Sequence, residues 1–409
     1  MKKITESLLC AATFAVMSLV AASCDSKPQL GGLTENEEAM KAIAAQYVPN
    51  VIYATYGDLA RETDELYELL AAAAADGPEG LTQARIDAVC AKFLQARQSW
   101  EEAEAFLFGA ATDFGIDPHI DTWPLDADGL ATELSNAEKV AALEGEDGIF
   151  YASAKLGQEL LGFHGIEFVL FRDGANRTAA ALQANETHPA FAGKTVTGAQ
   201  ELIYAAAVAG DLRDNCYRLC VSWNPDAPEE YVARCEELEV ATTVTGSGLS
   251  YGENLLSASE AGSSYRTWQS AMASILVAGC SNICAEVADV KMGNAHSGED
   301  INYIESPYSK QSFQDFIDNI LSIRYSLYGA AGASEAHVHS LMSFFREQGY
   351  SGVSAIESGL QASLDALQAC RKKGAFVDIY TDASVQTAMD AISALDDELN
   401  KAADWILRQ

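Results

Sequence analysis

A histidine and a glutamate with the spacing of a functional pair lie in one apolar stretch. His164 and Glu167 are separated by two residues in Gly162-Phe163-His164-Gly165-Ile166-Glu167, which on a helix places both side chains on the same face. A buried carboxylate without a partner costs several kcal/mol. We therefore expect Glu167 to meet a cation, a metal ion or a dedicated hydrogen-bond donor.

Three further charged residues occupy apolar stripes of predicted helices. In the helix expected over residues 86–108, Arg97 and Glu104 fall on the stripe of Ile86, Cys90, Phe93, Trp100 and Leu107. Arg324 follows Phe313, Ile317 and Ile320 in the same way. These positions predict a buried polar cluster beside His164, with Arg97 and Glu104 as an opposite-charge pair. The alternative is a set of structural salt bridges that fix helix register.

The elements that would position these residues are helices. Apolar residues recur at helical spacing over residues 46–75, 86–108 and 150–171, and strand alternation is almost absent. Trp-Asn-Pro-Asp-Ala-Pro at 223–228 is the best candidate linker. We predict an all-α protein with an N-terminal helical-bundle domain at 35–222 and a C-terminal one at 230–409.

The first residues have the pattern of a lipoprotein signal peptide. Lys2 and Lys3 precede an apolar stretch too short to span a bilayer, and Ala21-Ala22-Ser23 leads into Cys24. We expect residues 1–23 to be removed, Cys24 to be lipidated and 24–34 to form a tether. The alternative is an ordinary secretory signal. No later apolar run is interpreted as reaching bilayer length, and the densest, at 271–280, is expected to be one buried helix segment.

Composition excludes some partners. The formal charge of −33 disfavours nucleic acid and anionic membrane faces. The seven cysteines after Cys24 have spacings that suit neither a zinc ribbon nor a thioredoxin motif, so we expect mainly small core residues. The sequence contains neither H-E-x-x-H nor H-x-x-E-H.

Four stretches together resemble the imelysin-like family, which includes iron-regulated proteins and the insulin-cleaving membrane protease. They are residues 96–109, Asp121-Thr122-Trp123-Pro124, the G-x-H-x-x-E motif at 162–167 and Glu305-Ser306-Pro307-Tyr308-Ser309. The resemblance implies two helical bundles related by pseudo-twofold symmetry, a site near the motif and the domain interface, and a role in iron or other metal handling. We expect a functional cluster drawn from these four stretches and from the apolar stripes of the predicted helices. Its residues are Arg97, Trp100, Glu104, Asp121, Trp123, His164, Glu167, Ser309 and Arg324.

His164, Glu167 and Glu104 would offer a mixed nitrogen and oxygen site that suits iron, manganese or zinc. An arginine within reach would compete with a metal and favour an anionic or chelated ligand instead. We therefore expect a lipid-anchored protein of the bacterial cell envelope, periplasmic or surface-facing, that binds a metal ion or a small chelated ligand and could work with envelope transport proteins. A metal-dependent peptidase and a structural lipoprotein are the alternatives.

Overall fold

The computed structural model describes residues 32–409, and helix makes up 69% of the fold. The predicted all-α class is confirmed. The signal peptide and Cys24 lie outside the described residues. The helices of the first half are α1 Glu35–Tyr47, α2 Ala54–Gly80, α3 Gln83–Glu101, α4 Ala110–Asp113, α5 Asp117–Ile120, α6 Ala127–Leu134, α7 Ala137–Glu144, α8 Gly148–Lys155, α9 Gly162–Leu170, α10 Ala179–Leu182 and α11 Gly198–Trp223.

The second half begins with short helices and ends with the long helices α17, α19 and α21, which alternate with the short α18 and α20. They are α12 Glu229–Glu237, α13 Tyr251–Leu256, α14 Trp268–Ser274, α15 Asn282–Ala285, α16 Gly293–Ser297, α17 Ser312–Tyr328, α18 Leu341–Glu347, α19 Val353–Lys373, α20 Phe376–Ile379 and α21 Ala383–Ile406. Three π-helical segments join neighbouring helices at Val48–Tyr53, Ile275–Ser281 and Glu286–Met292. Two short strands, β1 Phe171–Arg172 and β2 Ala175–Asn176, form an antiparallel pair after α9.

Local sequence explains where the long helices begin and end. Thr34 and Glu37 form a capping box at the start of α1, and Thr197 and Gln200 form another at α11. The helical path of α2 is kinked at Gly77, whose φ of 64° lies in the left-handed region. The predicted stop near residue 76 therefore agrees with the structure.

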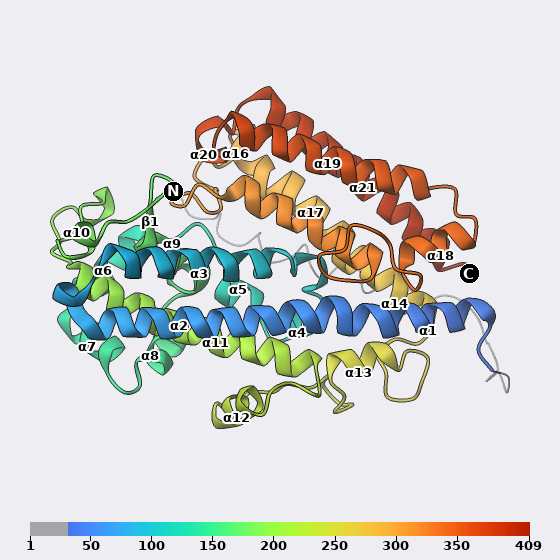
Figure 1. Cartoon of the computed structure of the whole chain (residues 1–409), viewed down its shortest axis with the longest axis horizontal. Helices are drawn as coiled ribbons and strands as arrows, with labels where there is room; N and C mark the ends of the chain where they lie inside the picture. Colours follow the sequence, from blue (N-terminus) through green and yellow to red (C-terminus); the bar gives the residue numbers. More distant parts are fainter. Residues whose placement is uncertain (1–31) are drawn as a thin grey trace, which may run out of the picture.

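The long helices pack in two groups that share one apolar core. Helix α2 packs against α3 and α11, while α19 packs against α17 and α21 (Figure 1). Contacts between α3 and α17 and between α1 and α14 join the groups, and one continuous cluster of buried apolar residues draws on both. The division into two domains at 222–230 and the pseudo-twofold symmetry stay predictions.

Two sequence expectations about single helices were wrong. Residues 150–171 do not form one helix, because α8 ends at Lys155 and α9 begins only at Gly162, with a 3-10 turn at Gln158–Leu160 between them. The continuous helix Trp268–Ser297 is long and apolar enough to cross a membrane by length and composition, contrary to our expectation. Its most apolar window is 67% buried in the fold, as is common for the core helix of a globular protein.

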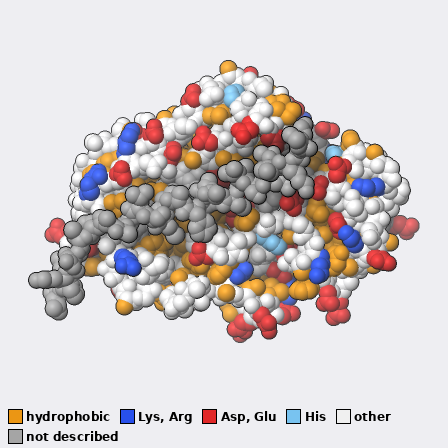
Figure 2. Space-filling view, turned by 180° about the vertical axis from the view of Figure 1, so that it is seen from behind, with side chains coloured by type: hydrophobic (Ala, Val, Ile, Leu, Met, Phe, Trp, Pro, Cys, Tyr) orange, Lys and Arg blue, Asp and Glu red, His pale blue; other side chains and the backbone are white. Residues whose placement is uncertain are grey.

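The surface reflects the acidic composition. Acidic side chains are spread over the face shown in Figure 2, with fewer basic ones among them. The seven cysteines of the described chain are all buried and free, in agreement with their expected role as small core residues.

Candidate functional site

Nine buried ionisable side chains from distant parts of the chain meet between the two helix groups. We call them the central cluster: Arg97, Glu101, Glu104, Asp121, His164, Glu167, Lys291, Glu305 and Asp315. Each is at most 5% exposed. The contributing elements are α3 and the 3-10 turn after it, the end of α5, α9, the segment before α17, α17 itself and the long helix Trp268–Ser297. The predicted burial of Arg97, Glu104, His164 and Glu167 is confirmed.

Gly162 brings His164 to Asp121. Its φ is +66°, and a side chain at this position would overlap the backbone carbonyl of Ile120. Only glycine therefore lets the start of α9 approach the end of α5 this closely. Gly165 is similarly tight, because a Cβ there would collide with the Tyr204 hydroxyl. Both glycines of G-x-H-G thus have a packing reason.

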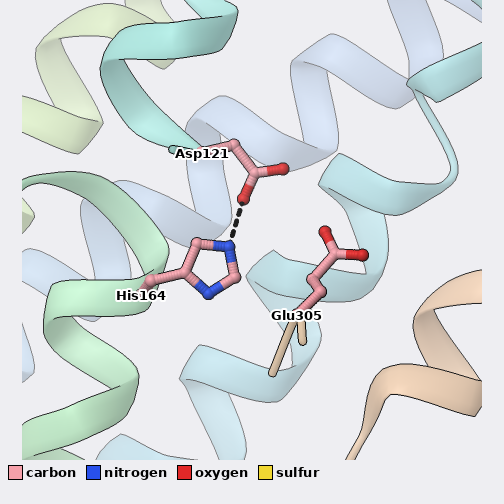
Figure 3. Close-up of side chains that lie close together, drawn as sticks. All are labelled: Asp121, His164 and Glu305. Carbon is pink, nitrogen blue, oxygen red and sulfur yellow. Dashed lines mark ion pairs between the residues drawn. The ribbon is translucent and has the colours of Figure 1, made fainter. Parts of the chain in front are cut away.

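Asp121 contacts three side chains of the site. Its Oδ1 forms an ion pair with Arg97 and lies 3.1 Å from Nε2 of His164, and its Oδ2 accepts a hydrogen bond of 2.7 Å from Nε1 of Trp100 (Figure 3). Burial alone would raise the pKa of Asp121. The positive charge of Arg97 and the contact with His164 outweigh it and hold that pKa well below its usual value. Asp121 is therefore ionised at neutral pH.

His164 and Glu167 lie together as the motif spacing predicts. Nδ1 of His164 is 3.7 Å from Oε2 of Glu167, while Oε1 of Glu167 accepts hydrogen bonds of 2.7 Å from both the backbone N–H and the hydroxyl of Ser309. Burial lowers the pKa of His164, but Asp121 and Glu167 more than compensate and raise it to about 9. His164 is therefore protonated at neutral pH when no metal ion is bound.

Lys291 and Arg97 face the other carboxylates. Nζ of Lys291 lies 3.2 Å from Oε1 of Glu305, 3.6 Å from Glu104 and 3.7 Å from Glu101. Arg97 pairs with the same Glu305 oxygen at 2.6 Å and with Glu101. Burial raises the pKa of Glu104 and Glu305 despite the charge of Lys291. Neighbouring carboxylates such as Glu101 raise both pKa values further.

The predicted pairing of Arg97 with Glu104 was wrong. Helix α3 ends at Glu101, and Glu104 begins a 3-10 turn, so Glu104 leaves the helical stripe and faces Lys291. The ion-pair partner of Arg97 on its own helix is Glu101, one turn away. Arg324 is only partly buried and lies beside Tyr325 and Glu102. Within residues 32–409 it forms no ion pair with the central cluster.

Sequence reasoning did not select Glu101, Lys291, Glu305 and Asp315. Glu101 follows Arg97 by four residues, a spacing that could have identified the pair. Lys291 stands in the most apolar long helix of the described chain, which was a usable signal. Glu305 opens one of the four stretches quoted for the resemblance, whereas nothing in the sequence distinguished Asp315.

Two groups of ligand atoms are close enough to share a metal ion. Within each group, all ligand atoms lie within 4.8 Å of one another: Asp121, His164 and Glu305 form one group, and Glu101, Glu104 and Asp121 the other. This differs from the set expected from sequence, since only His164 joins the first group and Glu104 belongs to the second. Oε2 of Glu305 accepts no hydrogen bond, so the first group offers a free oxygen beside an imidazole.

The motif also lines a cavity of about 280 Å³. Its walls are mainly apolar and aromatic, and His164 and Glu167 supply buried polar groups. The residues that surround it are Trp123, Pro124, Leu125, His164, Glu167, Ile301, Asn302, Ile304, Pro307, Tyr308 and Val377. Trp123 and Ser309, expected from sequence to belong to the site, thus lie at the cavity and against Glu167.

The other five histidines of the chain have partners elsewhere. His119 lies 2.8 Å from Asp211, His296 contacts the carbonyl of Tyr380, and His188 packs among aromatic rings. His337 and His339 are exposed next to each other. Each candidate ligand group therefore holds at most one imidazole.

Known proteins resemble the chain in sequence and in fold. Iron-regulated protein A of Synechococcus elongatus is 26% identical over 273 residues, which cover 67% of this chain and 60% of that protein. The crystal structure of an iron-regulated protein A precursor from Parabacteroides distasonis ATCC 8503 matches with a TM-score of 0.71 and 24% identity, over 91% of this chain and 96% of that one.

An imelysin-like protein from Psychrobacter arcticum 273-4 shares the fold at a TM-score of 0.57 and 13% identity, over 90% of this chain and 94% of that one. The sequence profile of the imelysin (peptidase M75) family matches residues 52–402. This range includes every residue of the central cluster and the whole cavity. The chain therefore belongs to the imelysin family.

Proposed function

We propose that this imelysin is a lipoprotein of the bacterial cell envelope that binds a metal ion or a metal-containing ligand in iron uptake or homeostasis. The observation that carries the proposal is the convergence of Asp121, His164 and Glu305 within 4.8 Å. The name of the relative from Synechococcus elongatus, iron-regulated protein A, supports a link to iron.

The donor set fits a metal ion chemically. One imidazole with two carboxylates suits iron, manganese or zinc, and the unpartnered Oε2 of Glu305 gives a metal a free oxygen to bind. Arg97 and Lys291 share Asp121 and Glu305 with any such ion and would weaken its binding. Since His164 is protonated without metal, binding must release its proton.

Peptidase activity is the second candidate because the family carries that designation. A zinc peptidase commonly uses about three protein ligands and an open position for water. The first group could supply three, but it includes one imidazole and has Arg97 on two of its carboxylates. These features favour binding over hydrolysis.

Calorimetric titration of the metal-stripped full chain with Fe²⁺, Zn²⁺ and Mn²⁺ tests the proposal. We expect His164→Ala and Glu305→Gln to weaken binding at least about tenfold while the helical circular dichroism is kept. His119→Ala is the matched control, because His119 pairs with Asp211 outside both ligand groups. Unchanged binding in His164→Ala would reject this site.

A peptide-cleavage assay on the same preparation separates the two candidates. We expect no metal-dependent cleavage. Cleavage that requires metal and disappears in Glu167→Ala would place the peptidase first.

The anchor is tested separately at Cys24. Because Cys24 follows small residues at the end of an apolar stretch, we expect Cys24→Ala to leave the membrane fraction or to remain unprocessed. Detergent-phase partitioning measures this. Partitioning equal to that of the wild type would rule out the lipid anchor.

A further inference from the structure

We infer that the cavity beside the motif binds a small organic ammonium group with an apolar body, held by Glu167. This rests on the proposed function, because both assume that the residues of the G-x-H-x-x-E motif bind a ligand. The ammonium group would belong to an organic ligand or to the organic part of a metal-containing ligand.

Glu167 has a free oxygen at the cavity and no place in either metal group. It is 1% exposed and lines the cavity, and its Oε1 is occupied by Ser309. Its Oε2 accepts no hydrogen bond, since Nδ1 of His164 is 3.7 Å away. The charge of His164 reaches Oε2 at 3.7 Å, but that distance is too long for a hydrogen bond. A buried acceptor without a hydrogen bond is costly, and a ligand N–H at Oε2 would supply one.

A second buried polar atom belongs to the same cavity. Nε1 of Trp123 is buried and donates no hydrogen bond, and Trp123 forms part of the wall. A ligand with an amine for Glu167 can therefore also offer an acceptor to the indole. Buried polar groups of proteins normally have partners, so two unpartnered ones on one cavity indicate a missing molecule.

The walls require more than a bare ion. Pro124, Leu125, Ile304 and Val377 are apolar. The volume of about 280 Å³ lies just below the usual range for ligand cavities, about 300 to 1,000 Å³, so the ligand must be small. A hydrated metal ion gains nothing from such walls, whereas a short hydrocarbon or ring buries apolar surface there.

Charge favours an ammonium over a neutral donor. A hydrogen bond between an ammonium and a carboxylate is about twice as strong as a neutral one. Glu167 also acts on its neighbour: burial first, and then the negative charge of Glu167, raise the pKa of Tyr308 to about 12. Protonated His164 lies 3.7 Å from Oε2 of Glu167. The six carboxylates of the central cluster still outnumber its three cations, so the charge beside the cavity stays negative and favours a cation.

The test compares two probes with the same hydrocarbon on metal-stripped full-length protein. Hexylammonium and 1-hexanol are titrated by calorimetry and by ligand-observed nuclear magnetic resonance. We expect hexylammonium to bind at least tenfold more tightly than hexanol. Glu167→Gln, which keeps an acceptor for Ser309, should remove about tenfold of the affinity for hexylammonium and leave that for hexanol unchanged.

Two further variants make the test specific. Val377→Trp fills the cavity from α20 while leaving all nine residues of the central cluster unchanged in sequence, and it should abolish binding of both probes. Glu144→Gln is the control, because Glu144 lies at a separate apolar groove lined also by Tyr67 and Ile203, and it should bind hexylammonium like the wild type.

Equal affinity of Glu167→Gln and wild type, equal affinity for the two probes, or no binding of either would overturn the inference. The metal titration is independent of these outcomes: a protein that binds metal through His164 but no ammonium keeps the proposed function and loses this inference. A protein that binds hexylammonium through Glu167 but no metal would reject the metal assignment alone.

Discussion

Two largely buried ionic networks lie at opposite ends of α9 and differ in how completely their side chains are paired. Beyond its C-terminal end, Arg172 and Arg177 meet Glu186 and Glu201, with Arg177 bidentate on Glu201 at 2.7 and 3.1 Å. We call these four the balanced network. It has two cations for two carboxylates, and none of its buried side-chain atoms is among the unpartnered ones of the described chain.

The central cluster lacks both properties. It has six carboxylates against Arg97, Lys291 and a protonated His164. Within the described chain, Glu305 and Asp315 each carry a buried oxygen with neither a hydrogen bond nor an ion pair, and Oε2 of Glu167 has only His164 at 3.7 Å. A network that only supports a fold can be completed by its own side chains. The incomplete one is therefore the candidate for ligand binding, and the complete one for structure.

The largest expected effect comes from removing a cation. Arg97→Met strands Asp121, Glu101 and Glu305 in a region already short of positive charge, and we expect a loss of about 3 to 5 kcal/mol of unfolding free energy. Arg177→Met should cost less, because Arg172 stays beside Glu186 at 2.9 Å. Urea unfolding at neutral pH with chelator measures both. A larger loss in Arg177→Met would contradict the proposed imbalance.

The fold class could be predicted from helical spacing, but the detail of the site could not. Periodicity placed Arg97 on a buried stripe correctly. It continued the stripe to Glu104, because no proline or glycine marks the end of α3 at Glu101. Periodicity also predicted one helix across Gly157 and Gly162. In the structure the helix is interrupted there, and this interruption lets His164 reach Asp121. Partners from distant segments, such as Lys291 and Glu305, depend on tertiary packing that one-dimensional patterns do not contain.

The protonation of His164 gives the next largest effect. Its pKa is about 9 in the folded protein and about 6.5 in the unfolded protein. Protonated His164 therefore contributes fully to the free energy of unfolding below pH 6.5, and this contribution is lost as the pH rises to 9. The difference corresponds to about 3 kcal/mol. We expect wild type to lose this much relative to His164→Gln between pH 6 and 9, measured by urea unfolding in chelator. Parallel pH profiles would show that His164 is neutral.

The smallest expected effect comes from Glu104 of the central cluster, which we compare with Glu201 of the balanced network. Burial raises the pKa of Glu104 well above its usual value, and Glu104→Gln keeps its shape while removing an excess charge, so we expect a change of at most about 1 kcal/mol. Glu201→Gln should cost about 1.5 to 3 kcal/mol, because it breaks charged hydrogen bonds to Arg177.

Both variants should be compared at pH 8, since burial raises the pKa of Glu201 to about 7 and Glu201 must be ionised for its pairing with Arg177 to count. Unfolding free energies from urea titration give the order. If Glu104→Gln lost more unfolding free energy than Glu201→Gln, the carboxylates around Lys291 would be as completely paired with cations as those of the balanced network. The surplus of negative charge that we connect with a bound cation would then be absent.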